Sequence, residues 1–314
     1  MATILTPRTG SRATAAGLTA LLIWSASVAL MRGMSESAGR LTGPALASLI
    51  GGGLALVWTR LRGESLSAML RLPPRYLFGC GALFVSCNVG LYLAIGACAD
   101  RSQTLVVALV NYLWPTLTVA LSVPILGRKA RAFLPWGCLL AVAGTAAALL
   151  GGCSGAAGDL GFWASGRGLF ALAMALVAAL SWGLYSNLAR LWGDPERGAV
   201  PLFALATAAA LGLLLLLRPE TPHWSVRAVL EVVSLGVASL MIAYALWDLG
   251  MRRGDHGLLG VCSYFVPVSS TLFSCLYLGV RPGWHVLAGC ALVAAGALLS
   301  SLALRPEPAP EACR

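Results

Sequence analysis

The residues best placed to do chemistry form a short polar segment inside an apolar run. The run covers about 102–124, long enough for a bilayer-spanning helix, and its centre reads Asn111-Tyr112-Leu113-Trp114-Pro115. Proline in a helix has no N–H and displaces the carbonyl four residues earlier, here that of Asn111. Within a bilayer such a carbonyl is tolerated only where protein or a wet cavity satisfies it. The segment therefore predicts a kink at a place that can hold a small polar solute.

The second half of the chain carries a counterpart of this segment. Ser263-Tyr264-Phe265-Val266-Pro267 lies in the apolar run 256–278, and Pro267 frees the carbonyl of Ser263 by the same rule. The two prolines are 152 residues apart (267 − 115), as are the two tyrosines (264 − 112). An ungapped match indicates an internal duplication, and the alternative is chance agreement in a chain rich in small residues. Further matches at this offset are Tyr92 with Tyr244, Gly137 with Gly289, and Gly144 with Gly296.

Aromatic and amide side chains deep in the apolar runs make up the candidate binding site. A deep Tyr or Trp needs a partner for its polar atom, so each could also serve only to join helices. Together they suit a small zwitterion, whose ammonium meets ring faces and whose carboxylate meets amide, hydroxyl or indole donors. A neutral metabolite or lipophilic drug would fit as well. The candidates are Trp24, Asn88, Tyr92, Asn111, Tyr112, Trp114, Trp182, Tyr185, Tyr244, Ser263 and Tyr264, with Pro115 and Pro267 as kinks that permit gating.

Charged and metal-binding residues do not gather near these segments. Glu231 and Asp248 lie toward the ends of one apolar run, each with an arginine four residues away, which is typical of an interfacial ion pair. The histidines lie near run edges, and the cysteines lack a paired metal spacing. We therefore expect no catalytic residue, no metal and no cofactor.

The composition indicates a polytopic membrane protein. Hydrophobic residues make up 58% of the chain and charged residues 11%, against about 25% charged in soluble domains. Of the Lys and Arg residues, 15 fall on the side of the N-terminus and 7 on the other. The net charge of +10 therefore reports topology rather than nucleic-acid binding, and both termini are predicted to be cytoplasmic. The predicted spans are about 13–33, 42–60, 74–98, 102–124, 131–151, 166–190, 199–218, 225–249, 256–278 and 282–304, followed by a disordered tail from about 305.

Ten spans in two copies require five spans in each copy. Because five is odd, the second copy enters the membrane from the opposite face, and such inverted repeats are typical of transporters with a site at the repeat interface. The predicted fold is an all-α integral membrane protein with an N-terminal repeat over 1–157 and a C-terminal repeat over 158–314. The fifth and tenth spans, rich in Gly and Ala, are predicted to pack closely as a scaffold.

The motifs resemble those of the drug/metabolite transporter superfamily, EamA type. The likeness rests on Trp24 and Trp182, on Leu30-Met31-Arg32-Gly33 with Ser35-Glu36, on Leu83-Phe84-Val85-Ser86, on Val110 to Pro115, and on Ser263-Tyr264-Phe265 with Pro267-Val268. Within the superfamily it is strongest to exporters of aromatic amino acids. The resemblance implies efflux of aromatic and other neutral amino acids across a bacterial inner membrane, through a central cavity walled by spans 1, 3, 4, 6, 8 and 9.

The hypothesis is a carrier that works by alternating access, complete as a monomer, with amino acids and the lipid bilayer as its partners. One alternative is a carrier of the same fold for drugs or other neutral metabolites. An intramembrane enzyme would need a nucleophile and a base at one depth, and a channel would need a filter motif; the sequence offers neither.

Overall fold

The chain folds into a bundle of α-helices. The computed structural model describes residues 7–151, 160–194, 197–254 and 256–304, and the tail from about 305 lies outside them. The helices are α1 (Pro7–Ser37), α2 (Thr42–Leu61), α3 (Leu66–Leu70), α4 (Gly81–Ala97), α5 (Arg101–Asn111), α6 (Trp114–Leu126), α7 (Leu134–Gly151), α8 (Leu160–Ala164), α9 (Gly166–Trp192), α10 (Val200–Leu217), α11 (Val226–Ser234), α12 (Tyr244–Arg253), α13 (His256–Ser263), α14 (Val266–Leu278) and α15 (Trp284–Ala303). Two π-helical segments, η1 (Arg75–Cys80) and η2 (Leu235–Ala243), lead into α4 and α12.

Most of these helices have the length and composition of membrane spans. Within the described residues, eight helical stretches are long and apolar enough to cross a bilayer, and two shorter apolar helices cover Leu134–Leu150 and Val266–Leu278. Large apolar side chains point outward, among them Leu217 (80% exposed) and Leu276 (85%). A soluble protein would not leave such a surface in water. The prediction of an all-helical membrane protein is therefore confirmed, whereas the crossing of all ten runs stays a prediction.

Two of the predicted spans are interrupted at their proline segments. α5 ends at Asn111 and α6 begins at Trp114, while α13 ends at Ser263 and α14 begins at Val266. Each proline lies in the first turn of the second helix, where its missing N–H has no helical partner to lose. Both second helices end on a glycine with positive φ, 65° at Gly127 and 68° at Gly279, a conformation that favours glycine. The two glycines are again 152 residues apart (279 − 127).

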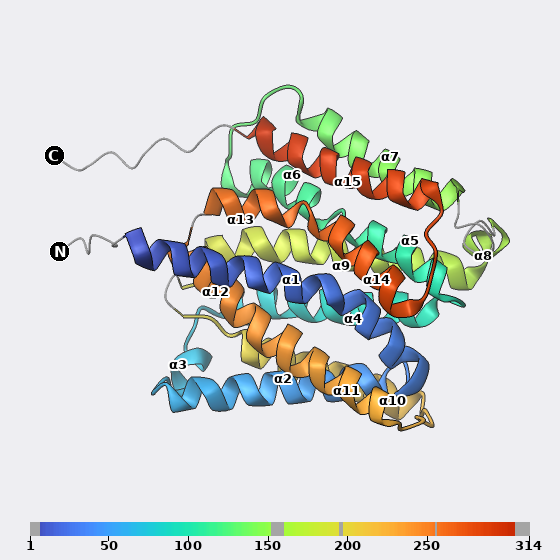
Figure 1. The fold of residues 1–314 in the computed structure, drawn as a ribbon. Helices are drawn as coiled ribbons and strands as arrows, with labels where there is room; N and C mark the ends of the chain where they lie inside the picture. Colours follow the sequence, from blue (N-terminus) through green and yellow to red (C-terminus); the bar gives the residue numbers. More distant parts are fainter. Residues whose placement is uncertain (1–6, 152–159, 195–196, 255, 305–314) are drawn as a thin grey trace.

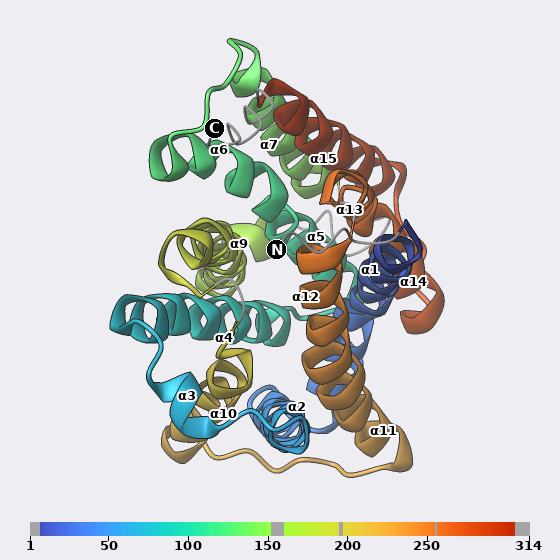
Figure 2. The ribbon, with the colours of Figure 1, turned by 90° about the vertical axis from the view of Figure 1, so that its left-hand side faces the viewer.

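The helices form two groups that face each other. In the α1 group, α1 packs against η2, α12 and α14, and also contacts α11 and α13; in the α9 group, α9 packs against α4, α5 and α6. Two helix pairs join the groups along opposite edges, α7 with α15 and α2 with α10. Figure 2 shows this plan, with α7 and α15 at the top and α2 and α10 at the bottom, and Figure 1 shows the same helices from the side.

The pair of α7 and α15 makes a close backbone contact, as its glycines predicted. A Cβ atom added to Gly144 would lie 2.8 Å from the carbonyl oxygen of Gly289, and one added to Gly289 would lie 2.6 Å from that of Gly144. Gly137 and Gly296 face each other in the same reciprocal way. Small residues let helix backbones approach where lipid provides no hydrophobic driving force.

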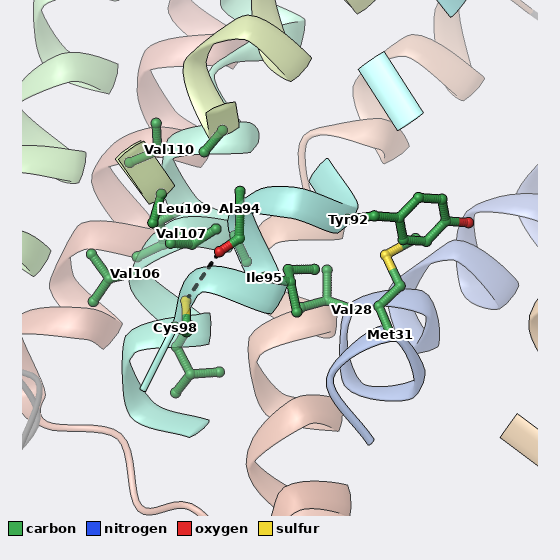
Figure 3. Packing of buried hydrophobic residues seen from close by; sticks show 14 of the residues in the cluster. Val28, Met31, Tyr92, Ala94, Ile95, Cys98, Val106, Val107, Leu109 and Val110 are labelled. Carbon is green, nitrogen blue, oxygen red and sulfur yellow. Dashed lines mark hydrogen bonds between the residues drawn. The ribbon is translucent and has the colours of Figure 1, made fainter. Parts of the chain in front are cut away.

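Apolar side chains of α1, α4 and α5 form the main core. Val106, Val107 and Leu109 of α5 are fully buried, and Figure 3 shows them beside Ile95 of α4 and Cys98, the residue that follows α4. The Cys98 thiol, 2% exposed, donates to the carbonyl of Ala94 at 3.4 Å. This core lies toward the end of the bundle where α1 and α4 finish and α5 begins.

The start of α2 is capped by a residue from the other half of the chain. Leu41, at the position before α2, supplies no side-chain cap. The carboxylate of Glu220 accepts instead from the backbone N–H groups of Arg40, Leu41 and Thr42, at 3.1, 3.0 and 3.0 Å. A carboxylate at this position satisfies otherwise unpaired helix donors and is favoured by the helix dipole.

Candidate functional site

A central cavity lies between the two groups of helices. Helices α1, η2, α12 and α14 line it from the α1 group, and α4, α5, α6 and α9 from the α9 group. Its lining residues are Leu21, Trp24, Ser27, Val28, Met31, Cys87, Asn88, Leu91, Asn111, Tyr112, Trp114, Trp182, Ser239, Leu240, Tyr244 and Val266. Seven of the eleven predicted site residues are among them, and they come from segments far apart in the sequence.

Aromatic rings in contact with one another form one wall of the cavity. Trp24 meets Tyr244 edge to face with ring centroids 5.1 Å apart, and Tyr244 lies 5.9 Å from Trp182. Trp182 in turn meets Trp114 edge to face at 6.4 Å. Such pairs are favourable at 4.5–7 Å and fix the orientation of each ring. The chain of rings crosses from the α1 group to the α9 group, so a planar solute between them would contact both.

The polar groups of the lining are neutral. The Asn88 amide donates to the carbonyl of Phe84 at 3.0 Å, and the Trp24 indole donates to that of Ser239 at 3.4 Å. The hydroxyls of Ser27 and Ser239 lie 3.0 Å apart and join α1 to η2. Asn111 and Tyr112, at the break between α5 and α6, are 9% and 5% exposed. Because no Asp, Glu, Lys, Arg or His is among the described residues that line it, the cavity offers hydrogen bonds without a fixed charge.

Four predicted site residues do not line this cavity. Tyr185 stacks on Trp182 with centroids 5.1 Å apart, directly behind the wall of rings. Tyr92 is 2% exposed and lies beside Met31 in Figure 3. Ser263 and Tyr264, at the break between α13 and α14, are 5% and 7% exposed, and Tyr264 lies close to Ser301 of α15. A direct contact of these four with a solute stays a prediction.

Sequence reasoning missed two kinds of residue around the cavity. The paired serines Ser27 and Ser239 have no spacing that marks them in a chain of this composition. A charged cluster made of Arg32, Glu36 and Arg101 joins the end of α1 to the start of α5, and it begins one residue after Met31, which lines the cavity. The available signal was an arginine within the first apolar run with a glutamate four residues later. Charged side chains in a membrane segment cost free energy, so their presence there indicates a functional role.

The cavity is small in this conformation. Its volume is about 120 Å³, below the roughly 300–1,000 Å³ typical of ligand pockets. Entry of a solute the size of an amino acid therefore requires the lining helices or aromatic rotamers to move. Among the side chains that the structure describes, no three His, Cys, Asp or Glu residues come together as a metal site would require.

A bundle of bilayer-length helices around a neutral, aromatic cavity defines a class of polytopic membrane proteins to which many transporters belong. Residues 169–302 match the model of the EamA-like transporter family. A solved crystal structure that is 33% identical aligns with a TM-score of 0.66, over 93% of this chain and 97% of that chain. The fold is thus one already seen by crystallography.

Three curated relatives are similar over nearly their whole length, and each is named aromatic amino acid exporter YddG. The protein of Salmonella typhimurium is 33% identical over 298 residues, that of Escherichia coli K12 is 30% identical over 298, and that of Ancylobacter novellus is 34% identical over 296. The alignments cover 94–95% of this chain and 99% of each relative. The chain therefore belongs to the EamA-like transporter family, as its motifs predicted, and is a multi-pass protein of the bacterial inner membrane.

Proposed function

We propose that this protein exports aromatic and other neutral amino acids by alternating access through the central cavity. The observation that carries the proposal is the lining itself, in which five aromatic residues and two amides surround a space without a fixed charge. Relatives named as aromatic amino acid exporters over the full length support the same substrate class. They are transporters, and we assign no enzymatic activity, cofactor or metal to the chain.

The lining supplies a partner for each part of an amino acid. An aromatic side chain rests on Trp24, Trp182 and Tyr244, whose faces also attract an ammonium group. The amides of Asn88 and Asn111 and the hydroxyl of Tyr112 donate to the carboxylate. Trp114 closes the wall on the α6 side. In this proposal Tyr92 and Tyr185 hold the lining rings in position, and Ser263 and Tyr264 act at the second helix break.

The topology we propose is two inverted repeats of five spans, residues 1–157 and 158–314, with both termini in the cytoplasm. Matching helix breaks at an offset of 152 residues support it, as do the matching glycine caps. The contact between α7 and α15 is reciprocal, because Gly137 meets Gly296 and Gly144 meets Gly289. A two-fold relation between the repeats produces such an exchange of partners. The packing of α1 on α12 and α14 likewise mirrors that of α9 on α4 and α6.

In the proposed cycle the α1 group and the α9 group tilt against each other around the substrate. The breaks at Pro115 and Pro267 let the two parts of each interrupted span move separately, while α7 with α15 and α2 with α10 keep the groups together. A solute can shift this equilibrium only through different affinities for the two states. A monomer contains the complete cavity, so we propose that it functions alone.

The alternative is a carrier of the same family for lipophilic drugs or other neutral metabolites. The observation in its favour is the apolar part of the lining, which includes Leu21, Val28, Leu240 and Val266. Such a surface binds apolar compounds without needing an ammonium or a carboxylate. Competition between amino acids and these compounds separates the two proposals.

The test is uptake of radiolabelled tryptophan, phenylalanine, threonine and methionine into proteoliposomes, without and with an imposed pH gradient. Saturable, mutually competing uptake supports the proposal, and the effect of the gradient reports proton coupling. Asn111→Ala should abolish or strongly reduce uptake, whereas Trp284→Phe, at a side chain 70% exposed, should not. No uptake of any of the four by folded protein would refute the amino acid proposal and favour the alternative.

Tyr264→Ala asks whether the second helix break belongs to the binding site. The internal duplication predicts a loss comparable to that of Asn111→Ala, whereas the cavity lining predicts a smaller one. Normal uptake by both variants would remove the helix breaks from the proposed site.

A further inference from the structure

A carboxylate shared by two arginines connects the two groups of helices at one end of the bundle. Glu36, near the end of α1, accepts from the Nε of Arg32 through its Oε1 at 2.8 Å. Its Oε2 lies 2.7 Å from an Nη of Arg101, the first residue of α5. Arg32 and Glu36 belong to the α1 group and Arg101 to the α9 group, so this carboxylate bridges the two groups just beyond Met31, which lines the cavity.

Backbone carbonyls complete the same connection. Arg101 donates from its other Nη to the carbonyl of Leu278 at the end of α14, at 2.8 Å. Arg32 donates to the carbonyls of Cys98 and Ile95 at the end of α4, at 3.0 and 3.4 Å. Each of these bonds joins one group to the other. Arg32, Glu36, Arg101 and their carbonyl partners are called the outer cluster below, because the proposed topology puts this end of the bundle outside the cytoplasm.

Neighbouring charged residues instead brace each group internally. Glu231 of α11 accepts from Arg227 at 2.9 Å and from the hydroxyl of Tyr277 on α14 at 2.6 Å. Its carboxylate also lies against Gly33 of α1, where an added Cβ would overlap it. These contacts hold α1, α11 and α14 together. In the other group, Arg167 of α9 donates to the carbonyl of Ala97 on α4 at 2.6 Å.

We propose that Arg32, Glu36 and Arg101 form the outer gate of the transporter and that the gate is closed in this conformation. The inference rests on the proposed alternating access between the two groups. Bonds inside a group survive a tilt of the groups, whereas the outer cluster must break to open a path from the cavity. The bridge from Glu36 to Arg101 is suited to this because Glu36 is 28% and Arg101 39% exposed, so water replaces the partner that each loses and breaking the bridge costs little. Arg32 is 9% exposed, so opening must also bring water to its guanidinium.

A native thiol beneath the outer cluster reports its opening. Cys98 is 2% exposed, and its own carbonyl is one of the acceptors of Arg32. The experiment measures the rate at which a water-soluble maleimide modifies Cys98 in nanodiscs, where both faces meet the reagent, so the result does not depend on orientation. Mass spectrometry of the Cys98 peptide separates it from the other cysteines. Cys80, fully buried at the end of η1, serves as the internal check of folding.

Removal of the charge pair should hold the gate open more of the time. Glu36→Gln and Arg101→Gln should each raise the rate at Cys98 about fivefold, the factor that corresponds to a partly exposed ion pair. Arg281→Gln makes the same change at an exposed arginine near this end and should leave the rate unchanged. Native rates at Cys98 in both gate variants would overturn the proposal.

Two further measurements distinguish an open gate from an unfolded protein and from a wrong substrate assignment. If Cys80 also becomes reactive, the gate variant has unfolded. Arg101→Lys is then used in place of that variant. Lysine keeps the positive charge but cannot contact Glu36 and the carbonyl of Leu278 at the same time. A native rate at Cys98 in that variant, with Cys80 protected, also refutes the gate. The labelling needs no substrate, so faster labelling together with absent amino acid uptake would retain the gate and refute only the proposed substrate.

Discussion

The contact between α7 and α15 makes a prediction that separates scaffold from site. We consider Gly289→Ala, which places a methyl group 2.6 Å from the carbonyl oxygen of Gly144 and 3.0 Å from the Cβ of Ala148. The first distance is 0.8 Å short of the 3.4 Å at which ordinary van der Waals contact begins (3.4 − 2.6). The obstacle is backbone, so no side-chain rotation relieves it and the helices must separate.

The expected magnitude follows from comparison with a glycine that has free space. Gly212 lies inside α10 with no atom within 4 Å of an added Cβ. Alanine gains about 1 kcal/mol over glycine in a helix interior at both positions. The difference between Gly289→Ala and Gly212→Ala is therefore the cost of overpacking alone, about 1–3 kcal/mol. This corresponds to a difference of roughly 2–10 °C in apparent melting temperature.

The assay heats the purified variants and measures the fraction that remains monodisperse by size-exclusion chromatography. The apparent melting temperature of Gly289→Ala should be lower than that of Gly212→Ala by the cost of overpacking. If α7 and α15 are a scaffold, the KM of uptake by folded Gly289→Ala protein should stay native. Equal stability of the two variants would refute the close backbone contact, and a changed KM would refute the scaffold role.

Three further predictions use other parts of the structure. Glu231→Gln weakens the acceptor of Arg227 and Tyr277 and should destabilise the protein by about 1–2 kcal/mol in the same heating assay, with Tyr277→Phe costing less because only one donor is lost. Gly127→Ala and Gly279→Ala each force alanine to positive φ and should cost about 1–2 kcal/mol, and clearly unequal costs would count against equivalent repeats. Trp24→Ala removes one end of the ring wall and should raise the KM of uptake about tenfold or more, whereas Trp24→Phe keeps a ring against Tyr244 and should raise it less.

The positions of the helices could be predicted closely from the sequence. Apolar runs bounded by Gly, Pro and charged residues put the second span at 42–60 and the fourth at 102–124, and the structure has Thr42–Leu61 and Arg101–Leu126. The reason is physical, since a bilayer sets both the length and the polarity of a span. The two helix breaks could be predicted equally well from the proline positions, because proline constrains the backbone of its own helical turn.

Which individual side chains point into the cavity could not be predicted from the sequence in the same way. Tyr112 and Tyr264 occupy matching positions in the two proline segments, yet of the two Tyr112 alone is among the lining residues of the cavity, while Tyr264 lies near Ser301. The equivalent local sequences meet different neighbours, and tertiary packing decides which ring faces the cavity. The bridge from Glu36 to Arg101 joins residues of different spans for the same reason, so no local spacing reveals it.

The cap that Glu220 provides for α2 has a consequence for biosynthesis. The donors at Thr42 precede their acceptor by 178 residues, which at the 5–20 residues per second of translation is a delay of roughly 10–35 s. During that time the first turn of α2 lacks its final partner, and a nascent chain that ends before residue 220 cannot complete it. The N-terminal half thus becomes a finished folding unit only after about two fifths of the C-terminal half has been synthesised (220 − 157 = 63 of its 157 residues), which makes the two halves of the chain dependent on each other from the ribosome onward.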